Sequence, residues 1–376
     1  MWNIRKVIKL KDMKLRTIAA VKKNNTIYFS PMYLNGVFSL DLEHENNVKC
    51  LGVFKEEDDE KQLYRRAYAC DSYIWFVTEN ATHVARISIE TNEIKVYKYG
   101  FHKQSKNGMF KYSDSFVIEN RYLCLVPGNT DAVVIVDMET GKEKIIYDVV
   151  NPENESYVAG TYTNGAIWLC PFDGDNLIKI NIENEHSERY KWGYGNEAFD
   201  GVCAVNNVLY FAPHKENVLL SINTDNLEES TLDISDMKCG DEKFQGIFKI
   251  NDEFWCMPFS AKFFLKYNLK SHKIIKCLEN DNRIFQNWEW TTNNFMPVTL
   301  QNGFMLASCF IDGILVYDVE DDKFDNIEID ISEYNLQEYY KKCLECGLLE
   351  KQFKSYAVDE KAGLLDFLCE NINSIY

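Results

Sequence analysis

The chain has 376 residues, of which 46% are hydrophobic, and its formal net charge is −17. This acidic balance argues against a nucleic-acid partner and against an anionic membrane surface, because both recruit clustered Lys and Arg. No apolar run approaches a membrane span, and the first residues, "MWNIRKVIKLKDMK", lack the continuous apolar stretch of a signal peptide. The 12 cysteines lie mostly in apolar strand patterns, which suits small buried hydrophobes. The sequence therefore predicts a cytoplasmic protein with reduced thiols.

The first predicted element is a strand over "NIRKVIKL" (3–10). If the chain closes into a ring, this segment could add a strand to the last repeat, since rings of repeats need a latch. The segment "FDNIEID" (324–330) competes for the same outermost place, and both assignments stay open.

An aromatic phrase then recurs seven times along the chain. Its copies are "IYFSP" (27–31), "IWFVT" (74–78), "LCLVP" (123–127), "IWLCP" (167–171), "LYFAP" (209–213), "FWCMP" (254–258) and "FMLAS" (304–308). Five of the seven prolines end such a phrase. Proline donates no backbone hydrogen bond, so it is expected at the end of a strand, where the chain leaves the ladder.

Each phrase lies in a unit of four short alternating segments separated by polar turns. One unit reads "SFVIEN", "LCLVP", "AVVIVDME" and "EKIIYDVV". Four strands in each of seven repeats of roughly 45 residues are typical of a seven-bladed β-propeller. The predicted fold is all-β, with a propeller over 1–331 whose four-stranded antiparallel blades cover roughly 15–54, 64–100, 112–150, 157–192, 199–234, 244–279 and 295–331.

The pattern changes at Ser332, which is a plausible helix N-cap. Apolar residues follow at helical spacing, and they are Leu336, Tyr339, Tyr340 and Cys343. Asp359 is placed to cap a second helix through "LLDFLCENI". We expect 332–376 to be a helical tail that packs on the propeller, with a docking element as the alternative.

Candidate binding residues come from the starts of the inner strands, which should line the mouth of the central channel. By alignment of the repeats this rank holds Arg16, Arg65, Asp114, Val158, Asp200, Gln245 and Phe295, with Arg66 adjacent. Arginines facing aspartates could form a structural charge network, or they could grip a carboxylate or phosphate with the guanidinium fork. His214 follows one of the prolines that end the recurring phrase and should lie on the same face, and Asp173 is a further candidate.

Aromatic residues in the connections between blades are a second set of candidates. Trp192 and Tyr194 lie in "KWGYGNEAF", and Trp288 and Trp290 lie in "IFQNWEWTTNNF". Amphipathic rings on a rim are typical of surfaces that hold sugars or peptides, although they could also fill gaps between blades. No two histidines have metal-ligand spacing, so the sequence predicts neither a metal nor a cofactor.

The repeat "IWFVTENATHVARISIETNEIKVYKY" (74–99) resembles the repeats of the streptogramin-lyase type of seven-bladed propeller, and more loosely those of the gluconolactonase and regucalcin propellers. In the lyases a catalytic histidine begins an inner strand in a Pro-His-Gly-Ile context, with a magnesium ion nearby. The matching stretches here are "FDGVCAV" and "FQGIFKI", which place Asp200 and Gln245 where histidine would stand. The resemblance therefore implies the fold without the lyase mechanism.

The function expected from these observations is a non-catalytic propeller that binds a peptide, glycan or protein on the face carrying the channel mouth. The alternative is a lyase or hydrolase of small molecules at the same mouth, with Asp200, His214 and Asp114 as catalytic candidates. A structural subunit that uses the tail as a connector is a third possibility.

Overall fold

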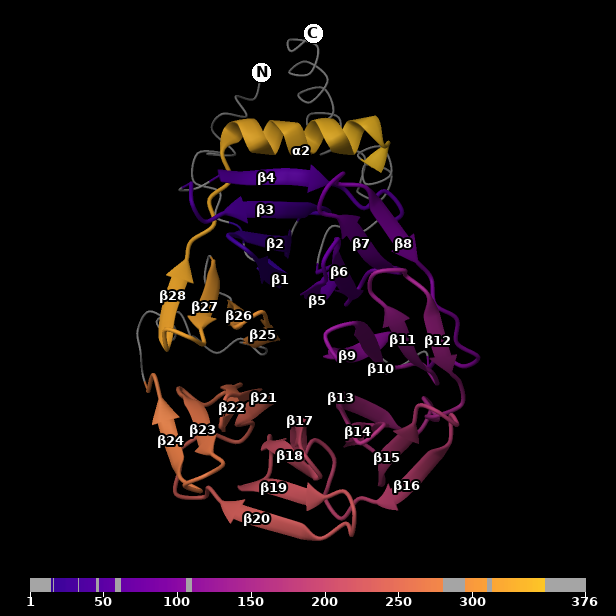
Figure 1. The fold of residues 1–376 in the computed structure, drawn as a ribbon, viewed down its shortest axis with the longest axis vertical. Helices are drawn as coiled ribbons and strands as arrows, with labels where there is room; N and C mark the ends of the chain where they lie inside the picture. Colours follow the sequence, from indigo (N-terminus) through magenta and orange to yellow (C-terminus); the bar gives the residue numbers. More distant parts are fainter. Residues whose placement is uncertain are drawn as a thin grey trace, which may run out of the picture.

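The structure is a computed structural model that describes residues 15, 17–32, 34–44, 47–57, 62–105, 110–279, 295–309 and 313–348. Seven antiparallel sheets of four consecutive strands surround a central axis, and the first strand of each sheet is innermost (Figure 1). The predicted seven-bladed propeller is confirmed. Among the described residues, no helix combines the length and apolar character needed to cross a bilayer.

The blades follow one another in chain order. Blades 1 and 2 contain β1 (Thr17–Lys23), β2 (Thr26–Pro31), β3 (Val37–Asp41), β4 (Asn47–Gly52), β5 (Tyr64–Ala69), β6 (Tyr73–Thr78), β7 (Val84–Ser88) and β8 (Ile94–Tyr97). Blades 3 and 4 contain β9 (Tyr112–Ile118), β10 (Tyr122–Pro127), β11 (Val133–Asp137), β12 (Glu143–Ile146), β13 (Ser156–Thr163), β14 (Ala166–Asp173), β15 (Asn176–Asn181) and β16 (Ser187–Lys191). Blades 5 to 7 contain β17 (Phe199–Val205), β18 (Val208–Pro213), β19 (Val218–Asn223), β20 (Glu229–Asp233), β21 (Phe244–Ile250), β22 (Glu253–Pro258), β23 (Phe264–Asn268), β24 (Ile274–Cys277), β25 (Phe295–Gln301), β26 (Phe304–Cys309), β27 (Ile314–Asp318) and β28 (Lys323–Ile327).

The rim prolines stand where the second strand of a blade ends. Four of them are the last residues of their strands, and the fifth, Pro171, lies two residues before the end of β14. The turns that follow lie on the same side of the ring as the connections between blades, because a meander of four strands returns to its starting side after the second and fourth strands. We call this side the mouth face.

We call the position at which proline ends the recurring phrase in five blades, near the mouth end of the second strand, the rim position. Every blade has a register shift near the mouth face, where the first strand pairs with this position. In blade 2 the partners are Tyr64 with Thr78 and then Arg66 with Val77, so Arg65 bulges out of the ladder. The equivalent partners in blade 3 are Tyr112 with Pro127 and Asp114 with Val126. A β-bulge of this kind re-aims the side chains beside it, which is why it commonly flanks a functional site.

These registers correct the alignment of the inner rank. Asp114 corresponds to Arg66, and Ser113 corresponds to Arg65. In blade 7 Phe295 pairs with Cys309, so Cys309 rather than Ser308 holds the rim position and Phe295 matches Tyr64. Arg16 lies outside the described residues.

The apolar core fills the spaces within and between neighbouring blades. The three largest buried side chains are Trp75, Trp168 and Trp255, which occupy the same place in the repeated phrase. Each lies beneath a cation from the third strand of its blade, namely Arg86, Lys179 and Lys266. Their indoles give the blades large apolar contacts together with a favourable cation–π interaction.

The ring closes where blade 7 meets blade 1. The segment predicted at 324–330 supplies β28, the outermost strand of blade 7, so this blade is complete without a strand from elsewhere. The Leu15 amide donates a hydrogen bond of 2.8 Å to the Ile329 carbonyl, and β1 packs against β25 and β26. The segment 3–10 lies outside the described residues.

The predicted start of the helical tail is confirmed. Helix α2 (Glu333–Glu345) begins after Ser332, whose side chain accepts a hydrogen bond from the Asn335 amide, and the helix lies along β4 (Figure 1). Its buried face packs into the core of blade 1 through Leu336, Tyr339 and Cys343. Asp359 and the predicted second helix lie outside the described residues.

We expect Tyr339→Ala to lower the free energy of unfolding by about 3 kcal/mol, because it empties an aromatic site in a packed core. The centre of the Tyr339 ring lies 5.7 Å from the centre of the Phe38 ring. The Tyr339 hydroxyl accepts a hydrogen bond from the backbone N–H of Asn35. Urea denaturation measures the change. Tyr334→Ala, at a side chain that is 68% exposed on the same helix, is the control. Equal stability of both variants would show that the helix is not anchored by this face.

The cysteines whose side chains the structure describes are free thiols, and most of them are buried. Burial raises the pKa of Cys50 and Cys70 to about 12, and it raises the pKa of Cys124 well above the usual range. The thiolate is the reactive form, so these side chains behave as packing residues.

Candidate functional site

The central channel contains a cavity of about 330 Å³ that is lined by the inner strands of blades 2 to 7. Six of the predicted residues line it, and they are Arg65, Arg66, Asp114, Val158, Asp200 and Gln245. Lys249, at the far end of β21, adds a charge that the sequence analysis did not single out. The structure thus brings the inner rank together around one space.

Arg66 and Asp114 form an ion pair across blades 2 and 3. The Arg66 Nη2 lies 2.7 Å from the Asp114 Oδ1, and their side chains are only 13% and 9% exposed. Burial raises the pKa of Asp114, and the Arg66 guanidinium opposes that rise. Because the charge of Arg66 is neutralised by Asp114, we assign Arg66 a structural role in the cavity wall.

Arg65 has a different environment. Its Nε is buried and has no hydrogen-bond partner among the described residues, and its guanidinium carbon lies 5.3 Å from the centre of the Phe110 ring. Glu79, just after the rim position of blade 2, is also buried, and its Oε2 lacks a hydrogen-bond partner within the described part of the chain. Burial raises the pKa of Glu79, and the charge of Arg65 opposes the rise. Arg65 therefore retains hydrogen-bonding capacity in a partly desolvated place.

Asp200 is the second acid of the cavity. Burial raises the pKa of its carboxyl, His214 and the two arginines oppose this, and Asp114 adds to it. The Nδ1 of His214 lies 2.9 Å from the Phe244 carbonyl oxygen, so this nitrogen carries the proton and donates it. His214 is 5% exposed and is not among the lining residues.

Two glycines allow the backbones that carry Asp200 and Gln245 to approach. Gly201 and Gly246 occupy equivalent bulges, with φ values of 131° and 73°. A Cβ on Gly201 would lie 2.6 Å from the Gly246 Cα. Because neither glycine has a side chain, the two backbones can touch, and this contact places Asp200 and Gln245 next to each other.

The structure describes two of the four aromatic residues predicted for the rim, Trp192 and Tyr194. Trp192 is 5% exposed and packs against Phe199 and Phe211, so it belongs to the core between blades 4 and 5 and is not a rim contact. Tyr194 is half-buried in the same cluster, and its hydroxyl donates to Glu229 at 3.0 Å. Trp288 and Trp290 lie outside the described residues. Asp173 accepts a hydrogen bond of 3.4 Å from Ser156 and does not line the cavity.

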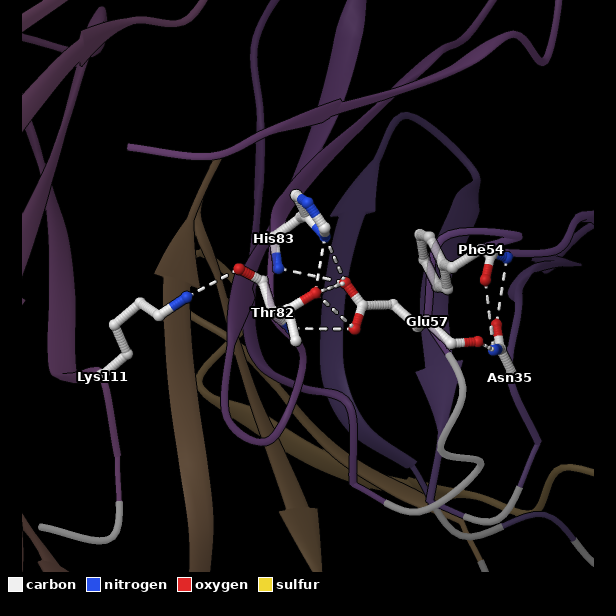
Figure 2. Close-up of polar contacts among 6 residues, drawn as sticks. All are labelled: Asn35, Phe54, Glu57, Thr82, His83 and Lys111. Atoms are coloured by element: carbon white, nitrogen blue, oxygen red, sulfur yellow. Dashed lines mark hydrogen bonds and ion pairs between the residues drawn. The ribbon is translucent and has the colours of Figure 1, made fainter. Parts of the chain in front are cut away.

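A buried carboxylate fastens the connection between blades 1 and 2 to the mouth face. Figure 2 shows Glu57, which is 3% exposed and accepts hydrogen bonds from the Thr82 amide at 2.8 Å and the His83 amide at 3.0 Å. The Thr82 hydroxyl and the His83 Nδ1 also contact this carboxylate. Lys111 extends the network toward blade 3 by donating to the Thr82 carbonyl. The network braces the side of the mouth where Arg65 lies.

We expect Glu57→Ala to lower the free energy of unfolding by about 2–3 kcal/mol, because it leaves two backbone donors without their charged acceptor. Thermal and urea denaturation measure the loss. Glu56→Ala is the matched control, since the ion pair that Glu56 makes within the described part of the chain is a long surface contact of 3.9 Å with Lys55. A loss no larger than that of the control would mean that the network does not brace the ring.

The comparisons with known proteins agree with the fold. No protein-family model matches the sequence, and no curated protein matches it. Virginiamycin B lyase from Staphylococcus aureus is similar in structure, with a TM-score of 0.60 and 12% identity over 80% of this chain and 96% of that chain. A streptogramin B lyase has a TM-score of 0.58 and 16% identity over 79% and 91% of the two chains.

Proteins of other kinds are similar to the same degree. The extracellular domain of a putative hybrid two-component system from B. thetaiotaomicron has a TM-score of 0.58 and 11% identity, over 86% of this chain and 42% of that chain. At these identities the likeness concerns the fold alone. The chain is a seven-bladed propeller with streptogramin B lyases among its structural neighbours, as its repeats predicted.

Proposed function

We propose that this propeller binds an anionic group, a carboxylate or a phosphate, in its central cavity through Arg65, without catalysing a reaction there. The observation that carries the proposal is the contrast between the two neighbouring arginines. Arg66 forms an ion pair with Asp114 at 2.7 Å, whereas Arg65 forms no ion pair among the described residues and its buried Nε has no hydrogen-bond partner there. A guanidinium presents its donors in a fork that fits a carboxylate or phosphate.

The size and charge of the cavity support a small ligand or the end of a peptide. A volume of about 330 Å³ lies at the lower end of the range for small-molecule sites. Asp114 and Asp200 balance two of the three cations that line the cavity, Arg65, Arg66 and Lys249. The lining residues alone thus leave an excess of one positive charge, although Glu79, which does not line the cavity, also interacts with the charge of Arg65. A peptide terminus from a protein partner could enter from the mouth face, in a cytoplasmic setting.

Catalysis is the second candidate, and His214 is the residue that favours it. Its proton is held on Nδ1 by the Phe244 carbonyl, which leaves Nε2 as a possible base near Asp200. However, His214 is buried behind the wall and the lining contains no histidine within the described residues. Binding without catalysis therefore accounts for more of the geometry.

We expect Arg65→Met to weaken anion binding by about 10- to 100-fold, which corresponds to losing a charged hydrogen bond of about 1.5–3 kcal/mol. Calorimetric titration of the full chain with succinate, citrate and inorganic phosphate measures the affinity. Arg121→Met is the control, because Arg121 is 56% exposed, pairs with Asp137 and does not line the cavity. If none of the three anions binds, or if Arg65→Met binds them as the unaltered protein does, the proposal is wrong. A loss of turnover in His214→Gln with unchanged affinity would favour the enzymatic alternative.

A further inference from the structure

Three polar residues from separate connections meet on the mouth face near blade 3, outside the central cavity. His102 precedes β9, Asp131 lies in the turn between β10 and β11, and Asp148 follows β12. One potential ligand atom from each of the three side chains lies within 4.8 Å of the others. A cluster of exposed acids would be unremarkable here, but one member of this cluster is not exposed.

Asp131 is buried, with 0% of its surface exposed. Its Oδ1 accepts a hydrogen bond of 3.0 Å from the His102 amide. Its Oδ2 is buried and has no hydrogen-bond partner among the described residues. A buried carboxylate oxygen without a donor or a cation is costly, so this atom calls for a partner that the described residues do not supply.

The equivalent residue of blade 1, Asn35, has hydrogen-bond partners for both of its side-chain polar atoms. Asn35 lies four residues after its rim proline, as Asp131 does, and its Oδ1 accepts from the Phe54 amide at 3.0 Å. Its Nδ2, however, donates to the carbonyls of Phe54 and Glu57 at 3.2 and 3.0 Å (Figure 2). Where blade 1 has an amide that donates, blade 3 has a carboxylate oxygen that can only accept. The substitution of acid for amide is what leaves Oδ2 without a partner.

We propose that His102, Asp131 and Asp148 bind a divalent transition-metal ion. One imidazole and two carboxylates suit ions such as Zn²⁺ or Mn²⁺. The His102 Nδ1 and the Asp148 Oδ2 are 3.4 Å apart, which equals the spacing of about 3.4 Å between two ligands at ~2.1 Å in a tetrahedral site. The His102 ring is oriented by stacking on Tyr147, with ring centres 4.1 Å apart and planes 6° apart.

Two further features set the strength of the site. His102 and Asp148 are 57% and 56% exposed, so water can complete the coordination sphere and the ion can exchange with solvent. The Lys103 Nζ lies 3.1 Å from the Asp148 Oδ1, whereas the His102 Nδ1 lies near the other oxygen, Oδ2. The Lys103 ammonium competes with the metal ion for the Asp148 carboxylate. This competition lowers the affinity below that of a site with three uncontested protein ligands.

The test is titration of the full chain with MnCl₂. Mn²⁺ prefers carboxylate ligands to thiolates, so the many cysteines of this protein should not bind it. We expect one saturable ion per chain, and an affinity at least tenfold weaker in Asp131→Asn. That variant should fold at least as well as the unaltered protein, since it restores the amide found at Asn35. Adding Mn²⁺ should raise the melting temperature of the unaltered protein and leave that of Asp131→Asn unchanged.

His102→Gln should lose binding in the same way, and it serves as the second variant. Asp41→Asn is the matched control, because Asp41, Glu43 and His44 form a similar cluster in which no buried oxygen lacks a partner. If the unaltered protein shows no saturable binding at millimolar Mn²⁺ or Zn²⁺, the site does not exist. Retained binding in Asp131→Asn and His102→Gln would also overturn the proposal, because the ion would then lie elsewhere.

Discussion

Replacing Arg66 with methionine is expected to lower the free energy of unfolding by about 3–5 kcal/mol, the largest loss among the substitutions considered. The methionine keeps much of the side-chain volume and removes the charge, so Asp114 is left buried and unmatched. The ion pair joins the inner strands of blades 2 and 3 at 2.7 Å, and both side chains are largely buried. Urea denaturation followed by fluorescence measures the loss.

The double variant Arg66→Met with Asp114→Leu is the decisive control. It removes both charges, and an apolar pair of similar volume is commonly neutral or stabilising at such a site. We expect it to recover most of the stability that Arg66→Met loses. A double variant as unstable as the single one would show that the charges themselves hold the two blades together.

Gly201→Ala is expected to cost at least about 3 kcal/mol, from a Cβ in a glycine-only conformation and from overpacking. The new atom would lie 2.6 Å from the Gly246 Cα and 2.9 Å from the Ile247 amide nitrogen. Both contacts are to backbone, so blades 5 and 6 must move apart at the point where Asp200 and Gln245 enter the cavity. Anion binding should weaken together with stability.

Gly193→Ala is the control for this substitution. Gly193 lies in the connection before blade 5, nothing lies within 4 Å of its added Cβ, and we expect a change within about 0.5 kcal/mol. Melting temperatures of the two variants measure the difference. If Gly201→Ala were as stable as Gly193→Ala, the close approach of the two bulges would not be needed for the fold.

The fold could be predicted from the sequence because its signal is repeated. Period-2 patterning, polar turns and a proline at the end of the second strand recur at nearly constant spacing, and each copy reinforces the others. The starting cap of the tail, Ser332, was likewise readable from local chemistry.

The site was predicted less well, for reasons that involve particular residues. The turn between the first two strands is one residue longer in blade 3 than in blade 2, so counting back from the end of the second strand aligned Asp114 with Arg65 rather than Arg66. Trp192 lies in a polar connection, but its burial depends on Phe199 and Phe211 of the next blade. Whether a charged side-chain atom has a hydrogen-bond partner depends on the folded structure. The sequence spacing therefore could not predict which atoms of Arg65 and Asp131 lack one.

The central claim is that the cavity receives an anion at Arg65, and crystals grown with 4-bromobenzoate test it most directly. This carboxylate carries a bromine whose anomalous scattering locates it without reference to the rest of the map. The account predicts a bromine peak within the central cavity and the carboxylate within hydrogen-bond distance of the Arg65 guanidinium, with both absent from crystals of Arg65→Met. A cavity that stays without bromine at saturating concentration, or an equal peak in the Arg65→Met crystals, would contradict it.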